Sequence, residues 1–108
     1  MTRSMREGYV ETPDGARVAY RVRPGRDPWI LLHGLGCDAT MWDGVVQALD
    51  PEAGLVVVEL RGHGGSTLGW KSPSVDLWAD DVLRVARAEG LTSPAIAGLS
   101  MGGYTALA

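Results

Sequence analysis

The spacing of apolar and polar positions predicts an antiparallel hairpin followed by alternating strands and helices. Two alternating stretches between residues 8 and 23 flank Thr12-Pro13-Asp14-Gly15, where proline presets φ and glycine supplies the positive φ of a tight turn. Continuous apolar runs at residues 29–32 and 55–58 predict strands covered on both faces, and a run at residues 94–97 predicts a third buried strand. Amphipathic spacing predicts helices at residues 40–49 and 75–89, and residues 104–108 are predicted to form the first turns of a third helix.

Local signals mark where these elements begin and end. Residues 24–28 start and finish with proline and are predicted to form a loop. Thr40, with Asp43 three residues later, is the predicted cap of the first helix. Ser74 is the predicted cap of the second helix, and Gly90 is placed to end it. Strands that alternate with helices after a hairpin predict an α/β protein with a mostly parallel sheet and an N-terminal antiparallel hairpin.

The composition is that of one globular domain, which we assign to residues 1–108. Hydrophobic residues make up 45% of the chain and charged residues 21%, which argues against disorder. The net charge of −3, without a basic block, argues against nucleic acid or an anionic membrane surface as a partner. No apolar run approaches the roughly 18 residues of a membrane helix, and Cys37 is the only cysteine. We therefore expect a cytoplasmic protein without an internal disulfide.

A serine motif lies near the end of the chain. Gly98-Leu99-Ser100-Met101-Gly102 follows an apolar run and has the G-x-S-x-G spacing of a nucleophile elbow, a sharp turn between a buried strand and a helix. Such a turn holds the serine in a strained conformation so that its hydroxyl projects above the sheet. Gly98 and Gly102 are needed because larger side chains would make the strand and the helix collide. The five-residue pattern is weak evidence by itself, because glycine-rich loops often contain a serine.

Two further motifs follow the two earlier apolar runs. His33-Gly34 comes directly after residues 29–32, and Arg61-Gly62-His63-Gly64-Gly65-Ser66 comes soon after residues 55–58. Together with the serine motif, and in this order, they resemble the α/β-hydrolase family, in particular its single-domain esterases, enol-lactonases and cofactor-free haloperoxidase-like members. The resemblance implies a partial α/β-hydrolase fold that ends just after the nucleophile elbow, so that residues 1–108 would be the incomplete N-terminal portion of a single domain. Glu59 stands where the family usually has Asp, a conservative change that we expect to affect loop packing and not chemistry.

The resemblance also implies the roles of individual residues. Ser100 matches the nucleophile, and the backbone N–H groups of Leu35 and Met101 match the oxyanion hole. The resemblance implies hydrolysis of an ester, lactone or related small-molecule acyl substrate through an acyl-enzyme on Ser100, with neither a cofactor nor a metal. The residues that support these loops are His33, Gly34, Gly98 and Gly102.

The remaining members of a catalytic triad are not found in this sequence. In the family the acid and then the histidine follow the nucleophile, whereas Ala108 is the last residue here. His33 and His63 are expected to satisfy backbone groups of their loops. A serine hydroxyl without a base is a poor nucleophile, so we expect this chain alone to be inactive and to be a fragment of a longer product. Residues 94–99 should then form an open strand edge, covered by a partner segment or another subunit.

Alternatives to a serine hydrolase remain open at this point. One is a non-catalytic, truncated or pseudo-enzyme chain that binds a ligand or a partner. Another is a dinucleotide-binding domain, because residues 34–39 fit G-x-G-x-x-A after a strand and Glu59 lies about twenty residues further on. Against this, a hairpin precedes the motif, and the serine motif stays unexplained. His33, Cys37 and His63 lack the tight spacing of a metal site.

Two neighbouring carboxylates lie on the second predicted helix. Asp80 and Asp81 are adjacent, so their side chains diverge by about 100° and cannot share a proton as a catalytic pair. Arg84 stands four residues after Asp80, which predicts a surface ion pair between these two side chains.

Overall fold

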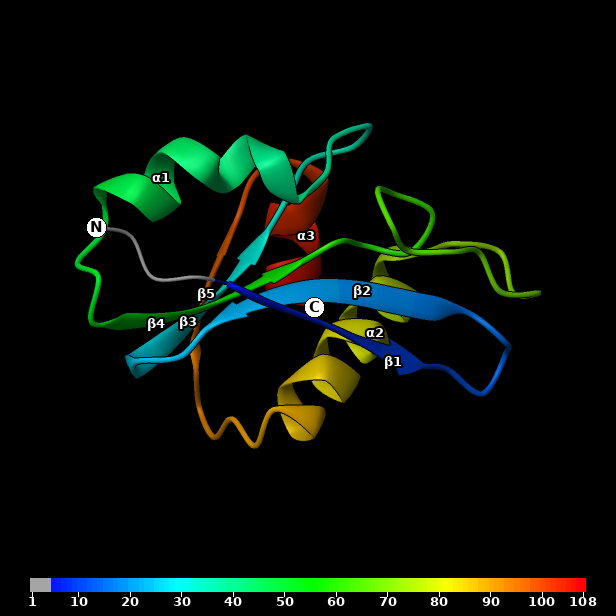
Figure 1. Ribbon diagram of the computed structural model, residues 1–108. Helices are drawn as coiled ribbons and strands as arrows, with labels where there is room; N and C mark the ends of the chain where they lie inside the picture. Colours follow the sequence, from blue (N-terminus) through cyan, green and yellow to red (C-terminus); the bar gives the residue numbers. More distant parts are fainter. Residues whose placement is uncertain (1–4) are drawn as a thin grey trace.

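A single sheet runs through the computed structural model, which describes residues 5–108 (Figure 1). Its five strands in this range lie in the order β1-β2-β4-β3-β5. The first two pairings, β1 with β2 and β2 with β4, are antiparallel, whereas β3 is parallel to both β4 and β5. The strands are β1 (Arg6–Glu11), β2 (Arg17–Arg23), β3 (Arg26–Leu32), β4 (Ala53–Val58) and β5 (Ala95–Gly98). This confirms the predicted α/β fold with an N-terminal antiparallel hairpin.

Helices cover both faces of the sheet. They are α1 (Asp43–Ala48), preceded by the 3₁₀ turn η1 (Ala39–Trp42), α2 (Val75–Ala88) and α3 (Met101–Leu107). Side chains of β3 alternate between two apolar clusters: Ile30 and Leu32 pack in the cluster that includes α2 and α3 residues, and Leu31 packs in the cluster beside η1 and α1. The central strands are therefore covered on both faces, as their continuous apolar runs predict.

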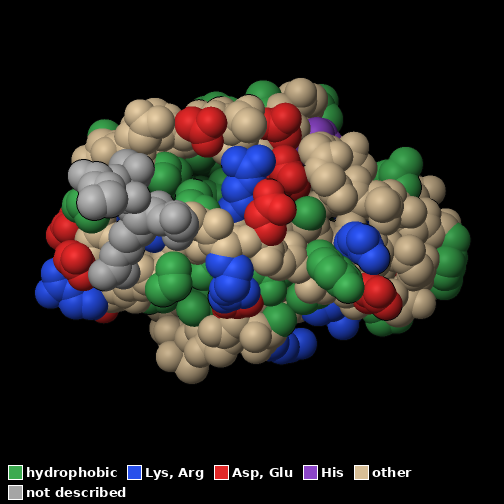
Figure 2. Space-filling model, viewed as in Figure 1, with side chains coloured by type: hydrophobic (Ala, Val, Ile, Leu, Met, Phe, Trp, Pro, Cys, Tyr) green, Lys and Arg blue, Asp and Glu red, His purple; other side chains and the backbone are tan. Residues whose placement is uncertain are grey.

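No long apolar helix occurs among residues 5–108, and charges of one sign do not gather on the face drawn in Figure 2. No helix among residues 5–108 combines the length and the apolar character needed to cross a bilayer. On the face drawn in Figure 2, acidic and basic side chains are interspersed and not gathered by sign.

Strand β5 differs from its prediction as a buried strand. It pairs with β3 on one side and with no other strand among residues 5–108. Ala95 is exposed and Ile96 keeps 39% of its surface accessible. The prediction of burial is wrong because burial of an edge strand depends on neighbours that an apolar run does not specify. The open edge itself was expected at residues 94–99, and a partner that covers it stays a prediction.

The first helix and the strand before it also differ from their predicted boundaries. Strand β3 begins at Arg26, which pairs with Ala53, and the register shifts before Trp29. The predicted loop at residues 24–28 is therefore mostly strand. Asp38, not Thr40, caps the helical segment, since its carboxylate accepts a hydrogen bond from the Thr40 N–H at 2.8 Å.

Helix α2 follows its predicted limits closely. The Ser74 hydroxyl accepts a hydrogen bond from the Leu77 N–H at 3.1 Å, which confirms the predicted cap. At the other end Gly90 has φ +69°, and the Leu91 N–H returns to the Ala86 carbonyl at 2.9 Å. This is the glycine-terminated helix end that the sequence predicts.

A buried arginine joins three segments that are distant in the sequence. The Arg61 guanidinium donates two hydrogen bonds of 2.9 Å to Asp81 of α2 and one to Asp14 of the hairpin turn. Hydrogen bonding to Arg61, and then to Thr12, holds the pKa of Asp14 well below its ordinary range. The expected Asp80–Arg84 pair is not among the ion pairs of residues 5–108, so Asp81 is the carboxylate that organises this region.

Candidate active site

Ser100 occupies a strained turn between β5 and α3. Its φ of 54° and ψ of −116° lie outside the regions that residues with a Cβ favour. The turn is tight because the Leu99 N–H still pairs with the Leu32 carbonyl at 3.2 Å, while the Gly102 N–H already bonds to the Leu99 carbonyl at 2.9 Å. Strand pairing and helix formation therefore meet at this serine, and the residue itself is exposed.

Two glycines allow this turn to form. A Cβ atom on Gly98 would come closer than 3.0 Å to the backbone of Gly102. A Cβ atom on Gly102 would overlap in the same way with the backbone carbonyls of Leu32 and His33. Backbone atoms of packed elements cannot move aside as a flexible side chain can. Both positions therefore require glycine because the backbones of neighbouring elements approach closely there, which is the reason given for these two glycines in the sequence analysis.

The loop after β3 lies against the serine turn. A Cβ atom built on Gly34 would stand 3.7 Å from the Cβ atom of Ser100 and 3.4 Å from the Leu99 carbonyl oxygen. Gly36, with φ +76°, turns the loop, and the Cys37 N–H bonds to the Gly34 carbonyl at 3.1 Å. The structure thus brings together the two segments that carry the predicted oxyanion donors.

Both predicted donors have free N–H groups. Met101 is the first residue of α3 and Leu35 lies in the loop after β3. Across residues 5–108, neither N–H group donates a hydrogen bond to a backbone or side-chain acceptor. Met101 is buried, where unpaired backbone donors are uncommon, whereas Leu35 is exposed. Such donors can stabilise negative charge that develops on a bound molecule.

His33 is a fully buried residue that joins this loop to the end of β4. Its Nδ1 lies 2.8 Å from the Gly34 carbonyl oxygen, and its Nε2 lies 2.8 Å from the Leu60 nitrogen. Because the Leu60 N–H is a donor, Nε2 accepts, and the ring is neutral with its proton on Nδ1. Burial, the largest influence, lowers the pKa of His33, and the nearby His63 lowers it further. His33 therefore satisfies loop backbone groups, as expected.

The described residues supply no hydrogen-bonded base for the serine. His63 lies with its Nδ1 3.2 Å from the Arg61 carbonyl oxygen and its ring beside that of His33, with 4.9 Å between the ring centroids. Within the described part of the chain, the Ser100 hydroxyl has no hydrogen bond to a histidine or a carboxylate. The predicted oxyanion segments are therefore brought together without the partner that would activate the hydroxyl.

Glu59 joins the loops after β3 and β4. Its carboxylate accepts hydrogen bonds from the Ala39 and Gly65 N–H groups, each at 3.0 Å. The side chain is nearly buried, with 8% of the residue exposed. Both oxygens are thus engaged with backbone, which argues against Glu59 as the ribose ligand of a dinucleotide site and supports its expected role in loop packing.

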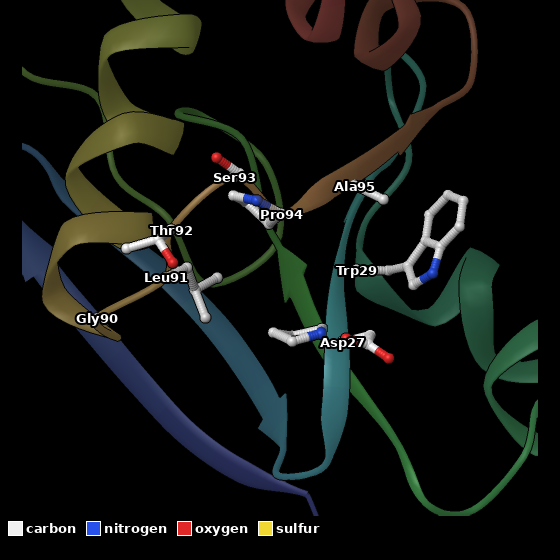
Figure 3. A pocket seen from close by; sticks show the side chains of 9 residues that line it. Asp27, Trp29, Gly90, Leu91, Thr92, Ser93, Pro94 and Ala95 are labelled. Atoms are coloured by element: carbon white, nitrogen blue, oxygen red, sulfur yellow. The ribbon is translucent and has the colours of Figure 1, made fainter.

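One cavity of the structure lies away from Ser100. A cavity of about 460 Å³ opens at the opposite end of β3 and β5. Figure 3 shows Asp27 and Trp29 of β3 beside the segment Leu91–Ala95, which leads into β5. Among the described residues, no group of three or more His, Cys, Asp or Glu side chains is arranged to hold a metal ion.

Comparisons with known proteins agree with this architecture. The model of the alpha/beta hydrolase family matches residues 29–108. A bifunctional esterase/perhydrolase of Acinetobacter calcoaceticus is 34% identical over 99 residues, covering 89% of this chain and 36% of the relative. The 3-oxoadipate enol-lactonase 1 of Acinetobacter baylyi is 33% identical over 78 residues, covering 72% of this chain and 29% of the relative. The crystal structure of a hydrolase from Pseudomonas aeruginosa has a TM-score of 0.83 at 28% identity, covering 92% of this chain and 38% of that one.

The fold and the serine turn place the chain in one class of α/β proteins. In this class a mostly parallel sheet follows an antiparallel hairpin, and a strained serine lies between a strand and a helix. The chain belongs to the α/β hydrolase family. It spans about a third of the length of the relatives that it matches.

Proposed function

We propose that Ser100 is the nucleophile of a hydrolase that acts on an ester, lactone or related small-molecule acyl substrate. The observation that carries the proposal is the backbone of Ser100, held at φ 54° in an exposed turn with the glycine loop after β3 against it. Strain of this kind persists only where the surrounding structure enforces it, and it is common at active sites.

The proposed chemistry is acyl transfer in two steps. The Ser100 oxygen attacks the substrate carbonyl carbon and loses its proton to a base, and the bond to the leaving oxygen breaks as that oxygen takes up a proton. Water then cleaves the acyl-serine ester and frees the acid and the serine. The N–H groups of Leu35 and Met101 would bind the oxyanion of each tetrahedral intermediate, and losing one such donor typically costs about 2.7–4 kcal/mol of barrier. No cofactor takes part.

The acid and the histidine of the triad would come from residues beyond Ala108. The support for this is the serine site itself, which lacks a base within residues 5–108, and the chain's short span relative to esterase and lactonase relatives. The missing base equally favours a second candidate, a non-catalytic chain that binds a ligand or partner through the same loops. The two candidates differ in whether Ser100 becomes reactive in the whole protein.

A fluorophosphonate probe distinguishes these candidates. We expect covalent labelling of the protein translated from the full reading frame, and its loss in Ser100→Ala. Ser93→Ala is the matched control, because Ser93 is also an exposed serine at positive φ, 52°, but lies at the other end of β5. Labelling that survives in Ser100→Ala would contradict the nucleophile assignment. A full-length protein that resists labelling altogether would favour the non-catalytic candidate.

A further inference from the structure

Strand β1 forms the edge of the sheet opposite β5. It pairs with β2 and with no other strand in the described part of the chain, and Figure 1 shows it, in dark blue, beside β2. The backbone N–H and C=O groups along an unpaired edge can bond to a further strand. The hairpin therefore carries a surface for association through its backbone.

The hydrogen bonds of β2 show which residues of β1 face outward. The Ala19 carbonyl accepts a hydrogen bond from the Glu59 N–H at 2.9 Å, so the backbone groups of Ala19 point away from β1. Ala19 is the cross-strand partner of Tyr9. In an antiparallel pair the N–H and C=O of Tyr9 then point out of the sheet edge, and every second residue shares this direction. The outward groups of β1 are therefore those of Glu7, Tyr9 and Glu11.

We propose that two copies of the chain associate through β1, with the two strands antiparallel about a two-fold axis at Gly8. Glu7 of each copy then exchanges both backbone hydrogen bonds with the partner's Tyr9, and the two Gly8 residues face each other. The sheet continues from one subunit into the other, which is association by strand addition. This inference does not depend on the proposed function.

Charge selects this register. Axes at Gly8 and at Tyr9 are the two that pair nearly the whole of β1. An axis at Tyr9 would place Glu7 directly opposite the partner's Glu11, twice across the interface, and like charges in this position destabilise a sheet. An axis at Gly8 places Glu7 opposite the partner's Tyr9, which is uncharged. The register at Gly8 is therefore favoured.

Arg17 of β2 adds an attraction across the interface. Its guanidinium lies over the Tyr9 ring, 4.2 Å from the ring centroid. Glu7 and Tyr9 are two residues apart on one strand, so their side chains project from the same face. The partner's Glu7, opposite Tyr9, therefore lies on the face that Arg17 covers. Among residues 5–108 neither Arg17 nor Glu7 forms an ion pair, so both charges are available to the other copy.

The other face of the interface leaves no charge without a partner. Arg6 projects there and would lie opposite the partner's Val10. Its guanidinium is already paired with Glu89 of its own subunit at 2.6 Å. The Tyr20 hydroxyl donates to the same carboxylate at 2.7 Å, and the Tyr20 ring lies against Gly8. The proposed pairing does not require this cluster to change.

Sedimentation velocity of the full-length protein tests the association. One strand pair buries little surface, so we expect a dimer with a roughly micromolar Kd that dissociates on dilution. Tyr9→Pro removes an outward N–H without removing a hydrogen bond of the hairpin, and proline is tolerated at such edge positions. The two-fold axis doubles the loss, so we expect Kd to rise about 100-fold. Tyr9→Phe keeps both the ring and the N–H, and this matched control is expected to dimerise as the wild-type protein does.

Two results of this experiment would overturn the inference. A wild-type protein that is monomeric at every concentration would show that β1 does not pair with a second copy, as when a later segment of the same chain covers the edge. A dimer that persists in Tyr9→Pro would place the interface elsewhere. Circular dichroism and thermal unfolding establish that the Tyr9→Pro protein is folded.

Disulfide cross-linking tests the register without the proline variant. Opposite residues that exchange hydrogen bonds have Cα atoms about 5.5 Å apart, within reach of a disulfide. We expect Glu7→Cys and Tyr9→Cys chains, mixed in a Cys37→Ser background, to form a covalent dimer of the two variants. Tyr9→Cys chains alone are the matched control and should not cross-link, since their cysteines would lie about 7–8 Å apart on the diagonal. Cross-linking of Tyr9→Cys alone, or none in the mixture, would overturn the proposed pairing.

Discussion

The two ends of β3 and β5 both hold non-glycine residues at positive φ, yet only one end has the features of an active site. At the carboxyl end Ser100 has φ 54°, and at the other end Asp27 and Ser93 have φ 44° and 52° beside the cavity of Figure 3. The Ser100 turn is enforced by glycines that admit no Cβ atom and is flanked by two free N–H groups. At Ser100 the strained backbone therefore coincides with close packing and with N–H groups that lack acceptors among residues 5–108, and this coincidence supports the proposed site.

The largest expected effect concerns the buried ion pair between Arg61 and Asp81. Asp81→Ala leaves Arg61 with fewer partners while it stays buried, and we expect a loss of about 3–5 kcal/mol in the free energy of unfolding in urea. Asp80→Ala is the matched control at the adjacent, exposed position, with an expected change within about 0.5 kcal/mol. Similar losses for the two variants would contradict the role of the buried network.

The glycine contacts give the next largest effect. Gly98→Ala forces a methyl group into the backbone of α3, and we expect a loss of about 3 kcal/mol or failure to fold. Gly44→Ala places the same methyl group in open space on α1, and we expect a gain of about 0.5–1 kcal/mol. A Gly98→Ala protein as stable as Gly44→Ala would show that the turn is not enforced by packing.

Relief of strain is expected to have a smaller effect of opposite sign. Ser100→Gly removes the Cβ atom from a backbone that disfavours it, so we expect a gain of about 1 kcal/mol in thermal or urea unfolding together with complete loss of labelling. Ser93→Gly is expected to change stability without affecting labelling. A loss of stability in Ser100→Gly would show that the serine conformation is not strained.

The smallest effect is a dependence on pH that is specific to His33. The unfolded chain takes up a proton near the ordinary pKa of 6.5, whereas burial lowers the pKa in the folded chain. Stability from His33 is therefore complete above about pH 6.5 and decreases as the pH falls, by at most about 1.4 kcal/mol per pH unit. His33→Asn should unfold with a shallower pH slope over this window, and identical slopes for the two proteins would contradict a buried neutral histidine.

Features set by neighbours in sequence were predicted from the sequence. The serine turn needs small residues two positions either side of Ser100, and this requirement is visible as Gly98 and Gly102. Helix α2 likewise has its cap and its end at Ser74 and Gly90, because both signals depend on backbone groups within a few residues.

Features set by distant parts of the chain were not predicted. Asp80 and Asp81 look equivalent in sequence, and only the position of Arg61 decides that Asp81 is buried. Strand β3 starts at Arg26 because Ala53 offers it a partner, which no local pattern shows. Asp38 and Thr40 are both good capping residues, and the path of the chain, not composition, selects Asp38.

The most direct measurement is a crystal structure of the full-length protein with a phosphonate bound to Ser100. The account predicts that the phosphoryl oxygen lies about 2.7–3.1 Å from both the Leu35 and the Met101 nitrogens, with the Gly34 carbonyl still bonded to His33. A phosphoryl oxygen that faces solvent, or a phosphonate bound to another residue, would contradict it.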